Sequence, residues 1–139
     1  MDKPLLISIV LGYFLGSIPF TQIVAKSVKG IDLRQVGSKN VGGRNTAHNV
    51  GLGWGIFAGA LDVLKGLAAM VCADKLGVPQ AAQYWAGLAA IAGHNWPVWL
   101  GFRGGKGIAV TLGLLAWVAF PEALIVFFVG AILLRSTNN

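Results

Sequence analysis

The chain has 139 residues, of which 55% are hydrophobic and only 12% are charged, and its formal net charge is +6. A soluble domain carries about 25% charged residues, so this composition excludes an ordinary soluble protein and favours a polytopic, all-α membrane protein. The basic balance does not indicate nucleic-acid binding, because no polar segment has a basic helical face or alternates basic with aromatic residues.

Three apolar runs are each about long enough to span a membrane as a helix, which needs roughly 20 residues. They cover residues 5–24, 50–72 and 81–100. The first run is expected to bend at Pro19, near its end. The third contains His94, a residue that a lipid-facing surface would not favour. These runs predict three spanning helices.

Glycines at four-residue spacing mark the faces along which two of these helices are expected to pack closely. They are Gly12 and Gly16 in the first run and Gly51, Gly55 and Gly59 in the second. Glycines at this spacing let the backbones of neighbouring membrane helices approach each other.

The last apolar stretch, residues 108–134, is interrupted near its middle by Pro121 and Glu122. A charged glutamate at mid-bilayer is costly, and the residue before a proline is biased out of the helix. We therefore expect two short spans that turn at Pro121, rather than one long helix. The total is about five transmembrane segments in a single domain, residues 1–139.

Placing the turns on alternate sides separates the charges by sign. One surface collects Lys26, Lys29, Arg34, Lys39, Arg44, Arg103, Lys106 and Arg135 against the single acid Asp32. The other surface collects Asp2, Lys3, Asp74, Lys75 and Glu122. By the positive-inside rule the first surface is cytoplasmic and the N-terminus is outside.

Residues 101–107 form a loop of four glycines and two cations, Arg103 and Lys106. Glycine allows the backbone to present successive N–H groups to a ligand, and the loop is expected to open a helix at Ile108 whose N-terminus attracts anions. The alternative is a turn whose two cations anchor at lipid headgroups. The walker-type and dinucleotide-binding glycine signatures are both absent.

A second polar stretch, residues 37–45, falls on the same predicted face. Its hydroxyl, amide and cationic groups suit phosphate oxygens and belong to Ser38, Asn40, Arg44 and Asn45. Two such loops facing one compartment favour a phosphate site over an interfacial turn.

Other chemically capable residues are few. His94 is either a general base or phosphate ligand, or a structural hydrogen-bonding residue. Asp62 and Lys65 are either an intramembrane functional pair or a pair that satisfies itself on one helix face. Cys72 is the lone cysteine. The sequence shows no paired carboxylates, no serine–histidine–aspartate arrangement and no metal-ligand spacing. The expected means of catalysis are therefore the binding of charge and the orientation of the reactants.

Several motifs together resemble, in order and spacing, the PlsY family of bacterial acyl-phosphate:glycerol-3-phosphate acyltransferases. They are Ser17-Ile18-Pro19-Phe20, Gly37-Ser38-x-Asn40-x-Gly42-x-x-Asn45, Asp62-x-x-Lys65-Gly66, Gly93-His94-x-x-Pro97 and the loop from Gly101 to Gly107. The resemblance covers essentially the whole chain.

This resemblance implies a multi-pass enzyme of the bacterial inner membrane with cytoplasmic active-site loops. Its substrates would be acyl phosphate and glycerol 3-phosphate, its products lysophosphatidate and phosphate, and it would need no metal, nucleotide or other cofactor. The implied phosphate-binding residues are Ser38, Asn40, Gly42, Asn45, Arg103, Gly104, Gly105, Lys106 and Gly107, with Lys106 foremost. His94 is the candidate catalytic residue.

The chain also departs from the family pattern. His48 stands where the family has an arginine, for which Arg44 is a possible substitute cation, and Lys39 stands where glycine is common. The sequence ends at Asn139, before the family's last spans, a serine and a third motif, and Ser136 is a candidate stand-in for that serine.

The chain is therefore expected to be an N-terminal portion of a seven-span fold. The alternative function is a truncated, non-catalytic homologue that binds phosphate-bearing lipid or acyl phosphate. In a further alternative, a second subunit or another copy of the chain in a homo-oligomer would complete the site.

Overall fold

The structure, a computed structural model, describes residues 2–136, except for the side chains of Glu122, Ala123 and Leu134. Within this part the chain is entirely helical, and Asn139 lies outside it. The elements are α1 (Lys3–Ser17), α2 (Phe20–Lys29), α3 (Gly43–Asn49), α4 (Leu52–Lys75), α5 (Gln80–Asn95), the 3-10 helix η1 (Val98–Leu100), α6 (Ile108–Val118) and α7 (Phe120–Ser136).

The first apolar run forms two helices, because the backbone leaves the helix at Ile18. That residue precedes Pro19 and is extended, with φ −64° and ψ 113°, as steric clash with the proline ring requires. The predicted bend is confirmed, and it is a full break. Helix α2 then continues to Lys29 and ends at Gly30 in the left-handed region, a conformation that glycine adopts without strain.

Two other helix boundaries differ from the sequence-based expectation. Helix α5 ends at Asn95 instead of continuing to residue 100, because Trp96 precedes Pro97 and adopts a non-helical φ of −129°. The last apolar stretch does form two helices, but the break falls at Ala119. Pro121 instead lies in the first turn of α7, where a missing N–H costs nothing.

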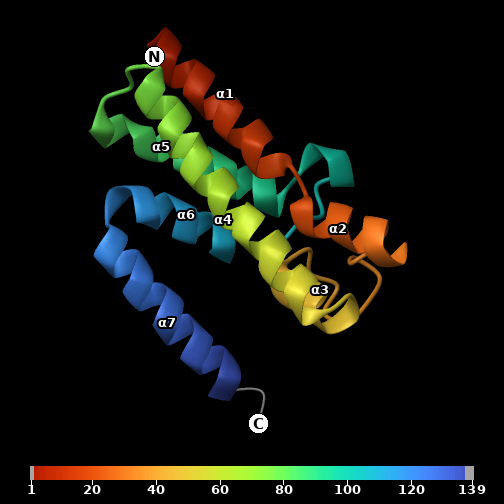
Figure 1. Ribbon diagram of the computed structural model, residues 1–139. Coiled ribbons are helices and arrows are strands. Elements are labelled where there is room, and N and C mark those ends of the chain that lie inside the picture. The colour runs from red at the N-terminus through yellow and green to blue at the C-terminus, as the bar shows by residue number, and fades with distance from the viewer. Residues whose placement is uncertain (1, 137–139) are drawn as a thin grey trace.

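Helices α1, α4 and α5 lie side by side, and α6 packs across α4 (Figure 1). Close backbone contacts hold this bundle together: Gly16 meets the backbone of Ala90, and Gly66 meets the backbone of Val110. A Cβ atom at either glycine would overlap these atoms. The predicted close packing at Gly16 is therefore confirmed.

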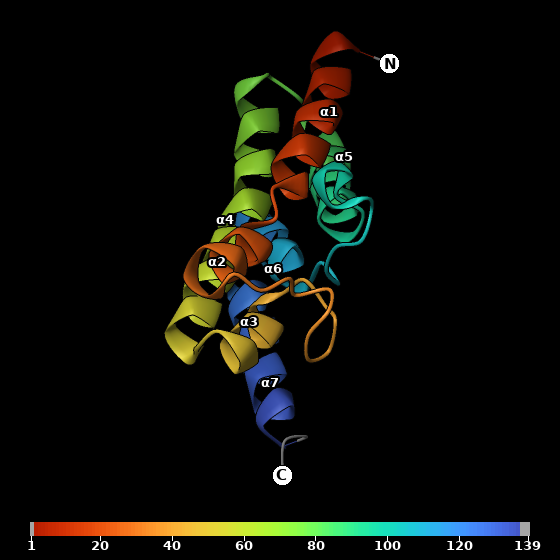
Figure 2. The ribbon, with the colours of Figure 1, turned by 90° about the vertical axis from the view of Figure 1, so that its right-hand side faces the viewer.

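The glycine stripe on α4 has a partner that the sequence did not suggest. Gly55 lies directly against Ala47 and the carbonyl of Gly43, both in the short helix α3. The polar segment before α4 thus folds back onto that helix. Helices α2 and α3 gather with the two polar loops, residues 37–45 and 101–107, at one end of the bundle (Figure 2).

Large apolar side chains cover much of the exterior, including Leu52 and Ile108, which are both exposed. Two segments, Lys3–Lys29 and Leu52–Lys75, are long and apolar enough to cross a membrane. Two ionisable residues lie inside instead, as Asp62 and Lys65 are almost completely buried. This inverted distribution is typical of a protein surrounded by lipid.

Candidate phosphate-binding site

The first loop, residues 37–45, is organised by the side chain of Asn45, which is 3% exposed. Its amide nitrogen lies 3.0–3.1 Å from three backbone carbonyl oxygens, and its amide oxygen accepts hydrogen bonds from the N–H of Ser38 and the side chain of Asn49. The carbonyls belong to Leu33, Val36 and Asn40. Asn45 therefore shapes the loop from within, while Ser38 is left exposed.

Lys39 has a φ of 58°, in the left-handed region that favours glycine. A non-glycine residue pays roughly 1–2 kcal/mol to adopt this conformation. The backbone geometry explains why glycine would suit this position. It also places an exposed lysine at the tip of the loop.

The glycine-rich loop, residues 101–107, is the second loop, and it folds onto the C-terminal end of α5. The N–H of Gly104 donates to the carbonyl of Asn95, and the N–H of Gly105 donates to the carbonyl of His94, each at 3.0 Å. These two N–H groups thus satisfy carbonyls that the end of a helix leaves open. In this conformation both N–H groups are engaged within the protein, and a role for them at a phosphate stays a prediction.

The two loops meet at Gly105. A Cβ atom there would overlap the carbonyl oxygen of Val41, in the first loop, and Nε2 of His94, in α5. Glycine is required at this position because the second loop passes between these two groups without room for a side chain. The structure thus brings the two predicted loops into direct contact.

Donors suited to an anion remain at this junction. The N–H of Thr111 donates to the carbonyl of Gly107 and is the first backbone hydrogen bond of α6. The N–H groups of residues 108–110 come before this bond, so they are the open donors of the helix N-terminus. Arg103 and Lys106 are exposed beside them. Arg44, the second residue of α3, is also exposed.

Asp62 and Lys65 form a buried ion pair of 2.8 Å on α4. Lys65 also donates a hydrogen bond of 2.7 Å to the carbonyl of Ile18, at the break between α1 and α2. Oδ1 of Asp62 nevertheless has no hydrogen-bond partner among the described residues, so both readings of this pair stay open, and the lysine ties α4 to the break.

His94 is buried between this ion pair and the second loop. Its Nδ1 is 3.7 Å from Oδ1 of Asp62, and its Nε2 faces Gly105. The adjacent Asn95 has a buried amide oxygen with no hydrogen-bond partner among the described residues, and this oxygen faces Gly107. His94 therefore supports the loop from beneath, with one nitrogen directed at it.

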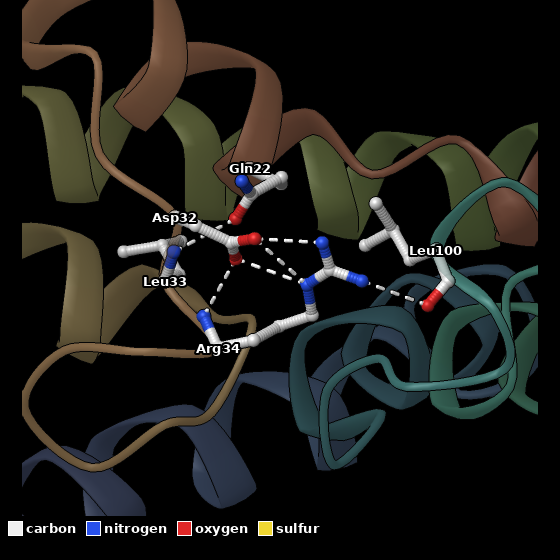
Figure 3. Close-up of polar contacts among 5 residues, drawn as sticks. All are labelled: Gln22, Asp32, Leu33, Arg34 and Leu100. Atoms are coloured by element: carbon white, nitrogen blue, oxygen red, sulfur yellow. Dashed lines mark hydrogen bonds and ion pairs between the residues drawn. The ribbon is translucent and has the colours of Figure 1, made fainter.

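A second ion pair, which sequence reasoning did not single out, lies where the loops approach each other. Arg34 contacts Asp32 through two nitrogens, at 2.6 and 2.9 Å, and donates a third bond of 3.0 Å to the carbonyl of Leu100 (Figure 3). The spacing of Asp32 and Arg34 is a weak signal, because any charged loop contains such pairs.

Arg34 lowers the pKa of Asp32 from 3.8 to about 2, chiefly through their side-chain hydrogen bond. Because the folded-state pKa is depressed, the pair contributes its full stability above about pH 4 and loses it only as the pH falls through about 2. The pair is therefore intact at neutral pH.

These features define a helical membrane protein with a basic, glycine-rich site at one end of its bundle. A model of the family described as glycerol-3-phosphate acyltransferase matches residues 6–139. The chain belongs to this glycerol-3-phosphate acyltransferase (PlsY) family, as relatives at about 45% identity also indicate.

Among the curated relatives, the glycerol-3-phosphate acyltransferase of Synechococcus sp. is 46% identical over 86% of this chain and 60% of its own length. That of Shouchella clausii is 45% identical over 89% of this chain and 62% of its own length. The chain thus spans about three fifths of the length of these relatives.

Two crystal structures of PlsY, an integral membrane glycerol 3-phosphate acyltransferase, are also similar. The glycerol 3-phosphate form has a TM-score of 0.83 at 39% identity, covering 93% of this chain and 66% of that one. The lysophosphatidic acid form has a TM-score of 0.79 at 37% identity, covering 89% of this chain and 61% of that one.

Removing one member of the buried ion pair is expected to be far more damaging than removing both. Asp62→Leu leaves the ammonium of Lys65 buried without its partner, which should lower the free energy of unfolding by about 3–5 kcal/mol. Adding Lys65→Met should recover most of this loss, because an apolar pair carries no desolvation penalty. Denaturant titration in detergent measures both values.

Asp2→Leu, just before α1, is the matched control because Asp2 is exposed and its side chain makes no cap hydrogen bond. If the double variant were as unstable as Asp62→Leu alone, the charge-pair explanation would be wrong.

Proposed function

We propose that this chain transfers a fatty acyl group from acyl phosphate to glycerol 3-phosphate, and that it yields lysophosphatidate and phosphate for phospholipid synthesis. The observation that carries the proposal is the junction of two glycine-rich, basic loops at Gly105. Both proposed substrates carry a phosphate group, and an acyl tail would lie naturally against the apolar helix surfaces. The family membership supports the same reaction.

The reaction needs no nucleophile from the protein. A hydroxyl of glycerol 3-phosphate attacks the acyl carbonyl, the new ester C–O bond forms, and the bond between the acyl carbon and the phosphate oxygen breaks. Phosphate leaves with the bonding electron pair, and the hydroxyl proton passes to this phosphate or to Nε2 of His94. The enzyme's task is to hold two anions close together and to stabilise the charge that shifts between them.

We assign the phosphate contacts to groups at the junction. Lys106 and Arg103 supply charge from the second loop, Ser38 and the half-buried Asn40 supply hydrogen bonds from the first, and Arg44 adds a cation at α3. The N–H of Gly42 already donates to the carbonyl of Asn40, so Gly42 shapes the first loop instead. The open N–H groups at the start of α6, after Gly107, add to the attraction for an anion. Gly104, Gly105 and Asn45 act indirectly, because their polar groups already hold the loops in shape.

We also infer a multi-pass arrangement in the bacterial inner membrane. The cations near both loops would lie on the cytoplasmic side and the N-terminus outside, in line with the positive-inside rule. About five spans would result if α6 and α7 each cross the membrane. The partners would be membrane lipid and the two phosphate substrates.

Activity is tested by incubating the reconstituted chain with palmitoyl phosphate and glycerol 3-phosphate and measuring lysophosphatidate. Lys106→Ala should lower kcat/KM by about 10²-fold or more, because it removes a charge that stabilises the departing phosphate.

His94→Gln should lower kcat by about 10²-fold with little change in KM if Nε2 accepts the proton.

Lys75→Ala is the matched control, since Lys75 lies at the far end of α4 from the loops. Turnover that is unchanged by Lys106→Ala would refute the assigned role of the second loop. Binding of glycerol 3-phosphate without any turnover would select the non-catalytic alternative instead.

The membrane orientation is tested by cysteine labelling in intact cells, after Cys72→Ser removes the native thiol. A cysteine at Ser38 should resist a membrane-impermeant maleimide until the cells are opened, whereas one at Lys75 should react from outside. The reverse pattern would overturn the proposed orientation.

A further inference from the structure

The Asp32–Arg34 pair lies in the segment that leads into the first loop, and Arg34 contacts the residue that precedes the second loop. Arg34 is two residues beyond Asp32 in the segment that leads into the first loop, and its third bond reaches the carbonyl of Leu100, the residue just before the second loop (Figure 3). The bond joins parts of the chain that are 66 residues apart. Arg34 is therefore placed to fix one loop relative to the other.

The Arg34 backbone is itself held firmly from the other side. The neighbouring Leu33 is fully buried, and its N–H donates to the side chain of Gln22 in α2. Leu33 belongs to an apolar cluster with Val41, and Leu100 packs against the same cluster. One end of the bridge is thus anchored in α2, and both loops share the apolar base beneath it.

The carbonyl of Leu100 marks the point where the chain reverses to enter the second loop. Gly101 and Phe102, which follow it, both have positive φ values, of 60° and 63°. The N–H of Arg103 also donates to this carbonyl, at 3.4 Å. A group that holds this carbonyl therefore influences where the second loop begins and where Arg103 is placed.

Arg34 is poorly suited to bind a phosphate itself. Three of its five N–H donors are engaged by Asp32 and Leu100. The carboxylate of Asp32 also offsets its charge at 2.6 Å. A neutralised guanidinium attracts an anion less than the exposed cations Arg103 and Lys106 do.

We propose that Arg34, held by Asp32, is a positioning residue that clamps the glycine-rich loop to the first loop and so sets the spacing of the two phosphate contacts. Its effect on turnover rests on the proposed function, whereas its effect on the second loop does not. A substitution at Arg34, in the segment before the first loop, should therefore loosen residues 101–107.

The direct test is amide hydrogen exchange in residues 101–107 of the Arg34→Gln variant. Loss of the bond to Leu100 should accelerate exchange there by about tenfold, although the substitution lies in the other loop segment. Lys26→Gln is the matched control, because Lys26 is an exposed cation near Asp32 that is not part of the clamp. Unchanged exchange in the second loop of Arg34→Gln would overturn the proposal.

A double-mutant cycle separates the clamp from general stability. Asp32→Asn should accelerate exchange in the second loop in the wild-type background, but should add nothing in the Arg34→Gln background, because Asp32 acts through Arg34. Additive effects would contradict this. If Arg34→Gln fails to fold, Arg34→Lys replaces it, since lysine keeps the charge but lacks the planar fork that reaches both partners.

The kinetic arm distinguishes positioning from direct binding. Arg34→Gln should lower kcat by about 10²-fold through misplacement of the loops, while the affinity for inorganic phosphate, measured by calorimetry, changes by less than about twofold. An equal loss of phosphate affinity would make Arg34 a direct ligand and refute the clamp. A wild-type chain without turnover would refute the proposed function, and the exchange measurement would still decide the clamp.

Discussion

The arrangement of the site depends on the absence of a side chain at Gly105. The second loop passes between the carbonyl of Val41 and the ring of His94, and any Cβ would push these groups apart. His94 is backed in turn by the buried Asp62–Lys65 pair, whose lysine donates a hydrogen bond to the carbonyl of Ile18. A continuous set of contacts therefore runs from the break in the first apolar run to the loop junction.

Much of the fold could be predicted from the sequence, because apolar runs and prolines act locally. Pro19 and Pro121 signalled two helix breaks, and the resumption of apolar sequence at Ile108 predicted the helix that follows the second loop. The end of α5 was misplaced by five residues, since the apolar composition continues past Trp96 although the backbone before Pro97 cannot remain helical. Helix α3 was missed because its polar sequence lacks an apolar face.

The site was predictable in composition but not in its internal bonding. The residue types identified both loops, and the resemblance supplied their order. Which N–H groups remain open depends on tertiary contacts, however, and those of Gly104 and Gly105 are used by the end of α5. The bridge from Arg34 to Leu100 spans 66 residues, so no local pattern reveals it.

If the two loops form one phosphate-binding site, they should respond to the ligand together. Titration of the isotopically labelled chain with glycerol 3-phosphate, followed by amide chemical shifts in detergent micelles, measures this. One site predicts that residues 37–45 and 101–107 shift together, with the same dissociation constant. Shifts confined to one loop, or two clearly different dissociation constants, would show that the loops do not form one site.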